Sequence, residues 1–215
     1  MKKNLTEIVF IIDRSGSMSG LEADTIGGFN SLIEKQKSEE GEALVSVVLF
    51  NDDSKVVYDR ADISKIEPMT RQQYVPAGCT ALLDAVGSAV SHIGNVHKYA
   101  RDEDVPEKTL FVITTDGMEN ASRNYDYARV KHMIERQQEK YDWEFMFLGA
   151  NIDAAAAAQD IGIAPTHAME YHADSMGTEV MYEAMACAVS DVRGGGLTEN
   201  WRKVIDRDNK RRKKK

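Results

Sequence analysis

An apolar run that ends in a carboxylate constrains the fold of this chain more than any other feature of its sequence. Residues 8–12 are all apolar and mostly β-branched, which predicts a buried strand of the kind found in parallel sheets. Asp13 follows directly, and Ser15 and Ser17 come at alternate positions after it. In an extended or looped backbone, their three side-chain oxygens can converge on one point. Hard oxygen donors of this type are preferred by Mg²⁺ and Mn²⁺.

Two later segments offer further oxygen donors beside predicted strands and helices. Residues 78–85, Gly-Cys-Thr-Ala-Leu-Leu-Asp-Ala, place Thr80 just before a predicted helix. Residues 111–117, Phe-Val-Ile-Thr-Thr-Asp-Gly, place Asp116 directly after a predicted central strand. Ligands of open α/β sheets bind outside the carboxyl ends of the strands, near the point where the strand order reverses. If the strands before Asp13 and Asp116 are neighbours, the three segments meet at one edge of the sheet.

The three segments together resemble the metal-ion-dependent adhesion site of von Willebrand factor type A domains. The order and spacing match over roughly residues 5–190, and all five metal-site positions are filled, by Asp13, Ser15, Ser17, Thr80 and Asp116. The resemblance implies direct binding of the metal by the hydroxyls and binding largely through water by the two carboxylates. It also implies an open metal position that takes an Asp or Glu from a partner protein. Cys79 departs from the family, which commonly has glycine there.

Alternating strand and helix signals predict the fold class. We expect a doubly wound α/β domain with a mostly parallel central sheet, one antiparallel edge strand and helices on both faces. The predicted strands are residues 8–12, 43–50, 55–58, 109–115, 143–148 and 168–172. The predicted helices are residues 24–37, 80–99, 125–140, the alanine run capped by Asp153, and 177–192. The domain is expected to span residues 1–192, followed over residues 193–215 by a glycine break and a basic C-terminal tail.

Charge is unevenly distributed along the 215 residues. The formal net charge is −8, although residues 207–215 carry seven basic side chains and one Asp. The acidic remainder argues against nucleic-acid binding by the main domain, because phosphate contacts need Lys and Arg on the binding face. The basic run alone could attract an anion, but such ends are more often solvated and disordered.

The compartment is expected to be the cytoplasm. Cys79 and Cys187 fit no metal spacing, which favours free thiols in a reducing environment. The first apolar run is too short for a signal peptide, and no stretch approaches the length of a membrane span. The sequence resembles small cytoplasmic bacterial and phage members of the family.

The favoured function is a non-enzymatic, metal-dependent protein-binding module. The expected metal is Mg²⁺, with Mn²⁺ and Ca²⁺ as alternatives, and no small-molecule substrate is expected. One alternative is an enzyme that uses the metal as a Lewis acid on a phosphate or carboxyl group. Such an enzyme needs a general base near the metal, but the three loops contain no His or Lys. Asp84, the one spare carboxylate nearby, is interpreted as a helix-surface residue. The other alternative is nucleic-acid association through the basic tail.

Several further residues have a structural and a functional interpretation. Glu119 and Asn120, just past Asp116, either shape the rim that a partner touches or cap a helix or turn. Trp201, beyond the glycine break, either packs back onto the domain or contacts a partner. The three histidines His92, His97 and His132 are interpreted as residues on helix surfaces.

Overall fold

The sheet of the computed structural model, which describes residues 1–213, has the strand order β3-β2-β1-β4-β5-β6. Every neighbouring pair is parallel except β2 and β3, which form an antiparallel hairpin at one edge. This confirms the predicted doubly wound, mostly parallel sheet. The strands are β1 (Lys2–Asp13), β2 (Glu42–Phe50), β3 (Ser54–Asp62), β4 (Pro106–Thr115), β5 (Glu144–Gly149) and β6 (Ala168–Glu170).

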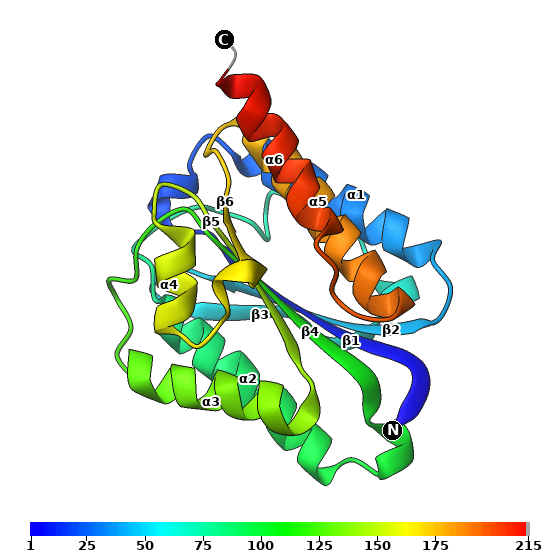
Figure 1. Cartoon of the computed structure of the whole chain (residues 1–215). Helices are drawn as coiled ribbons and strands as arrows, with labels where there is room; N and C mark the ends of the chain where they lie inside the picture. The colour runs from blue at the N-terminus through cyan, green and yellow to red at the C-terminus, as the bar shows by residue number, and fades with distance from the viewer. Residues whose placement is uncertain (214–215) are drawn as a thin grey trace.

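Helices cover both faces of this sheet (Figure 1). One face carries α1 (Glu22–Lys37), α5 (Ser175–Gly194) and α6 (Asn200–Arg212). The other carries α2 (Leu82–Tyr99), α3 (Tyr127–Tyr141) and α4 (Ala154–Asp160). Short 3₁₀ turns are η1 (Gly16–Met18), η2 (Ile63–Lys65), η3 (Asp102–Asp104) and η4 (Pro165–His167).

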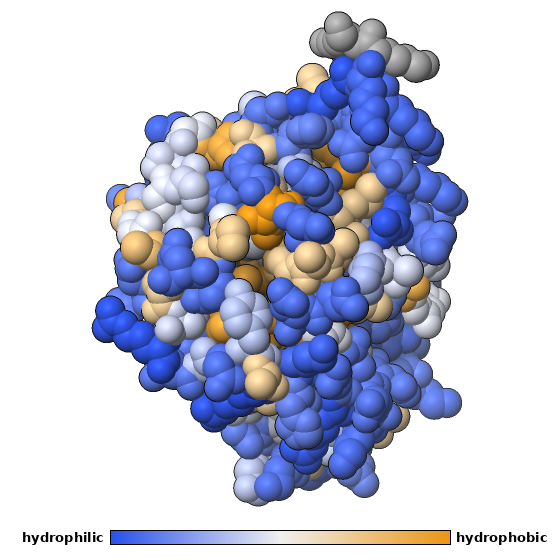
Figure 2. Space-filling model, turned by 60° about the vertical axis from the view of Figure 1, so that its left-hand side comes forward, coloured by the Kyte–Doolittle hydropathy of each residue, from blue (hydrophilic) through white to orange (hydrophobic). Residues whose placement is uncertain are grey.

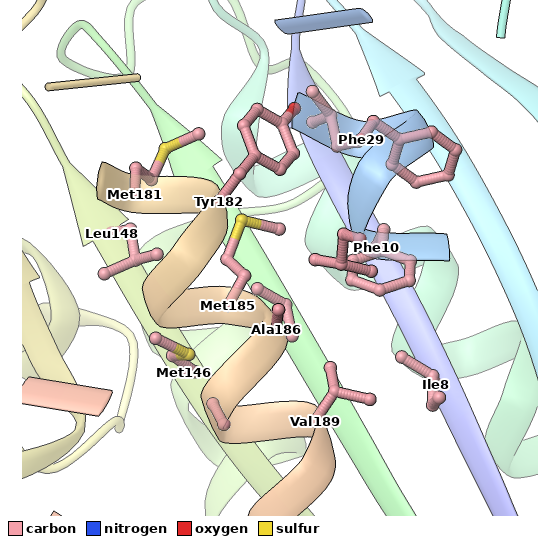
Figure 3. Packing of buried hydrophobic residues seen from close by; sticks show 14 of the residues in the cluster. Ile8, Phe10, Phe29, Met146, Leu148, Met181, Tyr182, Met185, Ala186 and Val189 are labelled. Carbon is pink, nitrogen blue, oxygen red and sulfur yellow. The ribbon is translucent and has the colours of Figure 1, made fainter. Parts of the chain in front are cut away.

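The apolar run of β1 is buried on both of its sides. Ile8, Phe10 and Ile12 belong to the core under α1 and α5, whereas Val9 and Ile11 belong to the core under α2 and α3. Two covered faces explain why the strand reads as a continuous apolar run rather than an alternating one. Figure 3 shows the first of these cores, where side chains of α5 lie over β1 and its neighbouring strands.

The strand order reverses between β1 and β4. β1 pairs with β2 on one side and with β4 on the other, and Ile12 is in register with both Leu49 and Thr114. The carboxyl ends of β1 and β4 therefore lie side by side. This is the adjacency on which the predicted meeting of the three segments depended.

The C-terminal segment differs from the expected solvated tail. α5 continues to Gly194, the chain turns, and α6 packs back against the domain. Trp201 and Ile205 are each only 1% exposed, so Trp201 packs onto its own domain. Arg202 extends the contact by donating hydrogen bonds to the carbonyl oxygens of Thr166 and Ala168. The basic run is helical up to Arg212 rather than disordered, because one apolar stripe of α6 is buried, while Arg207, Lys210 and Arg211 remain exposed.

The face of the molecule drawn in Figure 2 is mostly hydrophilic. Figure 2 shows one face, on which apolar residues form small separate patches among polar ones. Within residues 1–213, no helix has both the length and the apolar character that crossing a membrane requires.

Candidate metal centre

Asp13, the last residue of β1, is held in a fixed orientation. Its Oδ1 atom accepts a 2.6 Å hydrogen bond from the backbone N–H of Ser15, and its Oδ2 atom accepts a 2.7 Å bond from the hydroxyl of Thr115. The Asp13 backbone carbonyl accepts a 2.7 Å bond from the hydroxyl of Tyr74. The carboxylate is 1% exposed, so it faces the other site residues rather than bulk water.

A line of oxygens runs from Ser15 to Asp116. The hydroxyls of Ser15 and Ser17 are 3.0 Å apart, and the Ser17 hydroxyl donates a 2.6 Å hydrogen bond to Oδ1 of Asp116. Ser15 and Asp116 are buried, whereas Ser17 is exposed. The cluster is therefore open to solvent on the Ser17 side and closed behind it.

Thr80 completes the cluster from the loop before α2. A Cβ atom at Gly117 would lie 3.7 Å from the Thr80 hydroxyl oxygen and 3.9 Å from that of Ser17, so the two hydroxyls flank this glycine. The backbone N–H of Gly16 donates to the carbonyl of Gly78, which has a φ of +73°. The structure thus brings together all five residues singled out from the sequence.

Glu119 and Asn120 connect the Asp116 loop to the start of α2. Asn120 exchanges two hydrogen bonds with the backbone of Thr80, at 2.9 and 3.0 Å. The Glu119 carboxylate accepts from the backbone N–H groups of Leu83 and of residues 121 and 122. These contacts match the cap interpretation, and a role at a partner-binding rim stays a prediction.

Asp84 is not the free surface carboxylate that its helical position suggested. Its two oxygens accept hydrogen bonds from three consecutive backbone N–H groups, those of residues 123–125. Burial acts to raise the pKa of Asp84, but these hydrogen bonds outweigh it and lower the pKa. The side chain stabilises the loop before α3 and is not poised as a base.

The electrostatics of the cluster suit a cation. Burial raises the pKa of both Asp13 and Asp116, and the Asp13 charge raises that of Asp116 further. Within residues 1–213, neither carboxylate forms an ion pair with a Lys, Arg or His. Two buried acidic groups without a counter-charge are costly, and a divalent ion would remove that cost.

The donor set defines the class of site. Among residues 1–213, no three His, Cys, Asp or Glu side chains form a metal-binding group. Two carboxylates and three hydroxyls instead form an all-oxygen donor set. Such a set suits Mg²⁺, Mn²⁺ or Ca²⁺, whereas protein sites for zinc are usually built from nitrogen and sulfur ligands. The residues present therefore fit a hard divalent cation.

One histidine was misjudged from the sequence. His92 and His132 are exposed on their helices, as expected. His97 is instead largely buried, and its Nε2 atom lies 3.0 Å from the carboxylate of Glu7 on β1. Spacing along the helix could not predict this contact, because Glu7 is 90 residues away in the sequence.

No family model matches the sequence, and neither does any curated protein. Solved structures do match. The vWF domain of the type V pili tip protein Mfa5 from Porphyromonas gingivalis is 9% identical, with a TM-score of 0.57 over 90% of this chain and 98% of that domain. This chain has a von Willebrand factor type A-like α/β fold.

Two further structures carry metal. Manganese-loaded TRAP protein of Plasmodium vivax is 16% identical, with a TM-score of 0.56 over 83% of this chain and 72% of that one. Proximal thread matrix protein 1 of the mussel byssus, with a zinc-occupied MIDAS motif, is 14% identical, with a TM-score of 0.57 over 86% of this chain. The present chain spans about half of that protein, 46% of its length. At these identities the likeness establishes the fold.

Proposed function

We propose that this chain is a divalent-metal-dependent protein-binding module whose metal takes an Asp or Glu side chain of a partner protein. The convergence of Ser15, Ser17 and Asp116 with Asp13 and Thr80 at a solvent-open edge carries this proposal. The absence of a counter-cation at the two carboxylates, among the residues described, supports it further.

The five residues divide into two roles. Ser15, Ser17 and Thr80 would bind the metal directly through their hydroxyls. Asp13 and Asp116 would act largely through water and balance its charge. A divalent ion held by neutral hydroxyls keeps an electrophilic position that a partner carboxylate can fill. Mg²⁺ is the proposed ion, with Mn²⁺ and Ca²⁺ as alternatives.

A binding role is favoured over catalysis by what surrounds the cluster. The carboxylates of Asp84 and Glu119 are engaged by backbone N–H groups, and that of Asp52 accepts a hydrogen bond from the backbone N–H of Cys79. A metal-assisted hydrolase needs a general base within hydrogen-bond reach of the reacting water. We therefore propose a non-enzymatic module without a small-molecule substrate.

The proposed compartment is the cytoplasm. Cys79 and Cys187 are free thiols, which suits a reducing environment. Arg212 forms ion pairs with Asp174 and Asp208, so its charge is not free to contact a phosphate. This weakens the alternative of nucleic-acid association through the basic tail.

Metal titration tests the centre itself. Isothermal titration of the full chain with Mg²⁺, Mn²⁺ and Ca²⁺ should show one ion per chain, with affinity at least about tenfold weaker in Asp13→Asn and Asp116→Asn. Asp53→Asn, an exposed acidic residue outside the cluster, is the matched control and should bind as the wild type does. Equal binding by all four proteins would contradict the assignment.

Co-purification tests the partner. Tagged wild-type protein is incubated with lysate of the source organism in Mg²⁺ or in EDTA, beside Asp13→Asn and Asp53→Asn. A metal-bridged partner is retained in Mg²⁺ by the wild type and Asp53→Asn, and is lost in EDTA and with Asp13→Asn. Retention of the same proteins under every condition would show that the cluster does not carry the interaction.

A further inference from the structure

A cavity of about 770 Å³ lies between α2 and α3, at the edge of the sheet opposite the candidate metal centre. The second halves of the two helices and the amino-terminal ends of β4 and β5 form its walls. Its volume falls within the range of about 300–1,000 Å³ that is typical of small-molecule sites. None of the five residues of the metal cluster contributes to it.

The inner wall is aromatic and rigid. Trp143 lines the cavity, is 5% exposed, and stacks on Phe111 with the ring centroids 5.3 Å apart. The ring of His97 meets Trp143 edge-on at a centroid distance of 5.3 Å. Gly94 allows α2 to approach α3 closely, since a Cβ atom there would lie 3.1 Å from the side-chain nitrogen of Gln137. These aromatic contacts hold Trp143 and His97 in place at the base of the cavity.

A buried charge cluster orients the histidine. Glu7 has no exposed surface, and both of its carboxylate oxygens accept 2.9 Å hydrogen bonds from Nε of Arg60. The Nε2 atom of His97 lies 3.0 Å from the same carboxylate, so this contact orients the ring. Replacing a cluster of this kind by packed apolar side chains of the same volume is often neutral, so its presence is weak evidence for a role in stability. Its clearest effect is to hold His97 beside the cavity.

The helix walls carry basic side chains. His132, Arg136 and Lys140 follow one another at intervals of four residues, so they share one face of α3, and that face lines the cavity. Lys98 faces them from α2. Within residues 1–213, Lys98, Arg136 and Lys140 make no ion pair with a carboxylate.

Three carboxylates also line the cavity, two of them near the start of β4. Glu107 is already engaged there, because its carboxylate accepts a hydrogen bond from the backbone N–H of Asn4. Arg136 and Lys140 lie on the α3 wall, and the third carboxylate follows directly after that helix. The acidic lining residues are Asp102, Glu107 and Asp142.

We propose that this cavity binds a small organic anion that carries a flat aromatic group. The aromatic group lies against Trp143 and His97, and the carboxylate, phosphate or sulfonate group points toward Arg136 and Lys140. The assignment is independent of the metal centre. The sequence predicted no small-molecule substrate, and the proposed anion is a bound ligand at a second site.

Matched pairs of probes test the proposal on the full ¹⁵N-labelled chain. Indole-3-acetate and naphthalene-2-sulfonate are titrated beside their neutral amides, and backbone amide shifts are recorded. We expect saturable shifts confined to residues 91–98 and 132–143 with at least one anion, and about tenfold weaker binding of its amide. The titrations are repeated in EDTA and should be unchanged, which separates this site from the metal centre.

A double variant tests the charge contacts. Arg136→Ala with Lys140→Ala should weaken binding of the anion about tenfold or more. Arg129→Ala with Lys131→Ala removes the same charge from the same helix outside the cavity, and should bind as the wild type does. The proposal is overturned if neither anion shifts these residues, if acid and amide bind alike, or if the two double variants are indistinguishable.

Discussion

The hydroxyl of Tyr74 donates a 2.7 Å hydrogen bond to the backbone carbonyl of Asp13. Both residues are 1% exposed, and they are 61 positions apart in the chain. The bond fixes the segment that leads to Thr80 against the end of β1, so it sets two of the three loops of the candidate metal centre relative to each other.

Tyr74→Phe should therefore affect both stability and metal binding. A buried carbonyl that loses its donor costs about 1–3 kcal/mol of unfolding free energy. Loosening of the Asp13 loop should also weaken Mn²⁺ binding severalfold. Urea denaturation and Mn²⁺ titration measure the two effects. Tyr58→Phe is the control, because its hydroxyl contacts the backbone of exposed Glu67 far from the cluster. If the two variants bind Mn²⁺ equally well, Tyr74 does not position the site.

Two adjacent glycines of α1 should respond to alanine in opposite directions. A Cβ atom at Gly28 would lie 2.3 Å from the ring of Tyr182 on α5, whereas one at Gly27 meets nothing within 4 Å. Gly28→Ala should cost about 1–3 kcal/mol through overpacking. Gly27→Ala should stabilise by up to about 1 kcal/mol, because alanine favours a helix interior. Chemical denaturation compares them, and a shift of the same sign in both would contradict the α1–α5 packing.

Trp201→Ala tests whether α6 is part of the domain. Removing a tryptophan that is 1% exposed should cost about 3–5 kcal/mol. Amide exchange should then accelerate along α6 and along α5 beneath it. Arg207→Ala, an exposed position on the same helix, should stay within about 0.5 kcal/mol of the wild type. A Trp201→Ala protein as stable as Arg207→Ala would mean that α6 is not docked in solution.

The pairing of Asp174 with Arg212 predicts a pH-dependent contribution to stability. Hydrogen bonding from Arg212 lowers the pKa of Asp174 to about 2, against about 3.9 for an unfolded chain. A lowered folded pKa gives stability that is complete above the unfolded pKa and is lost as the pH falls toward 2. Asp174 is half exposed, so its share at neutral pH should be below about 1 kcal/mol.

Asp174→Asn isolates this contribution, since asparagine can still accept the helix-capping bond from the backbone of Gly177. We expect the variant to be less stable than the wild type at pH 7 and the gap to close between about pH 4 and pH 2. Urea titrations over this range measure it. If the stability difference between the two proteins instead widens on acidification, the ion pair does not stabilise the fold in the way proposed.

Local pattern predicted most of the sheet, and the same pattern together with the family resemblance predicted the residues of the candidate site. Apolar runs predicted the buried strands, and the strand-to-loop position of Asp13, Thr80 and Asp116 predicted where their side chains meet. These features depend on residues that are close in sequence, and the strand order follows general rules for α/β connections.

What the pattern missed depends on distant partners. β1 begins at Lys2 rather than at Ile8, because the buried charge of Glu7 is matched by Arg60 and His97, far along the chain. The docking of α6 rests on two buried apolar side chains, too few for periodicity to reveal. The use of Asp84 as an anchor for a loop 40 residues away is likewise invisible to local spacing.

The core beneath α6 has a consequence for the order of events during synthesis. Trp201 and Ile205 share one apolar cluster with Ile8 and Phe10 of β1. The part of this cluster that Trp201 and Ile205 cover is therefore closed only after α6 has been synthesised. Until then the nascent chain exposes part of this face, so a ribosome stalled before residue 201 would hold a sticky, protease-sensitive intermediate rather than a finished domain.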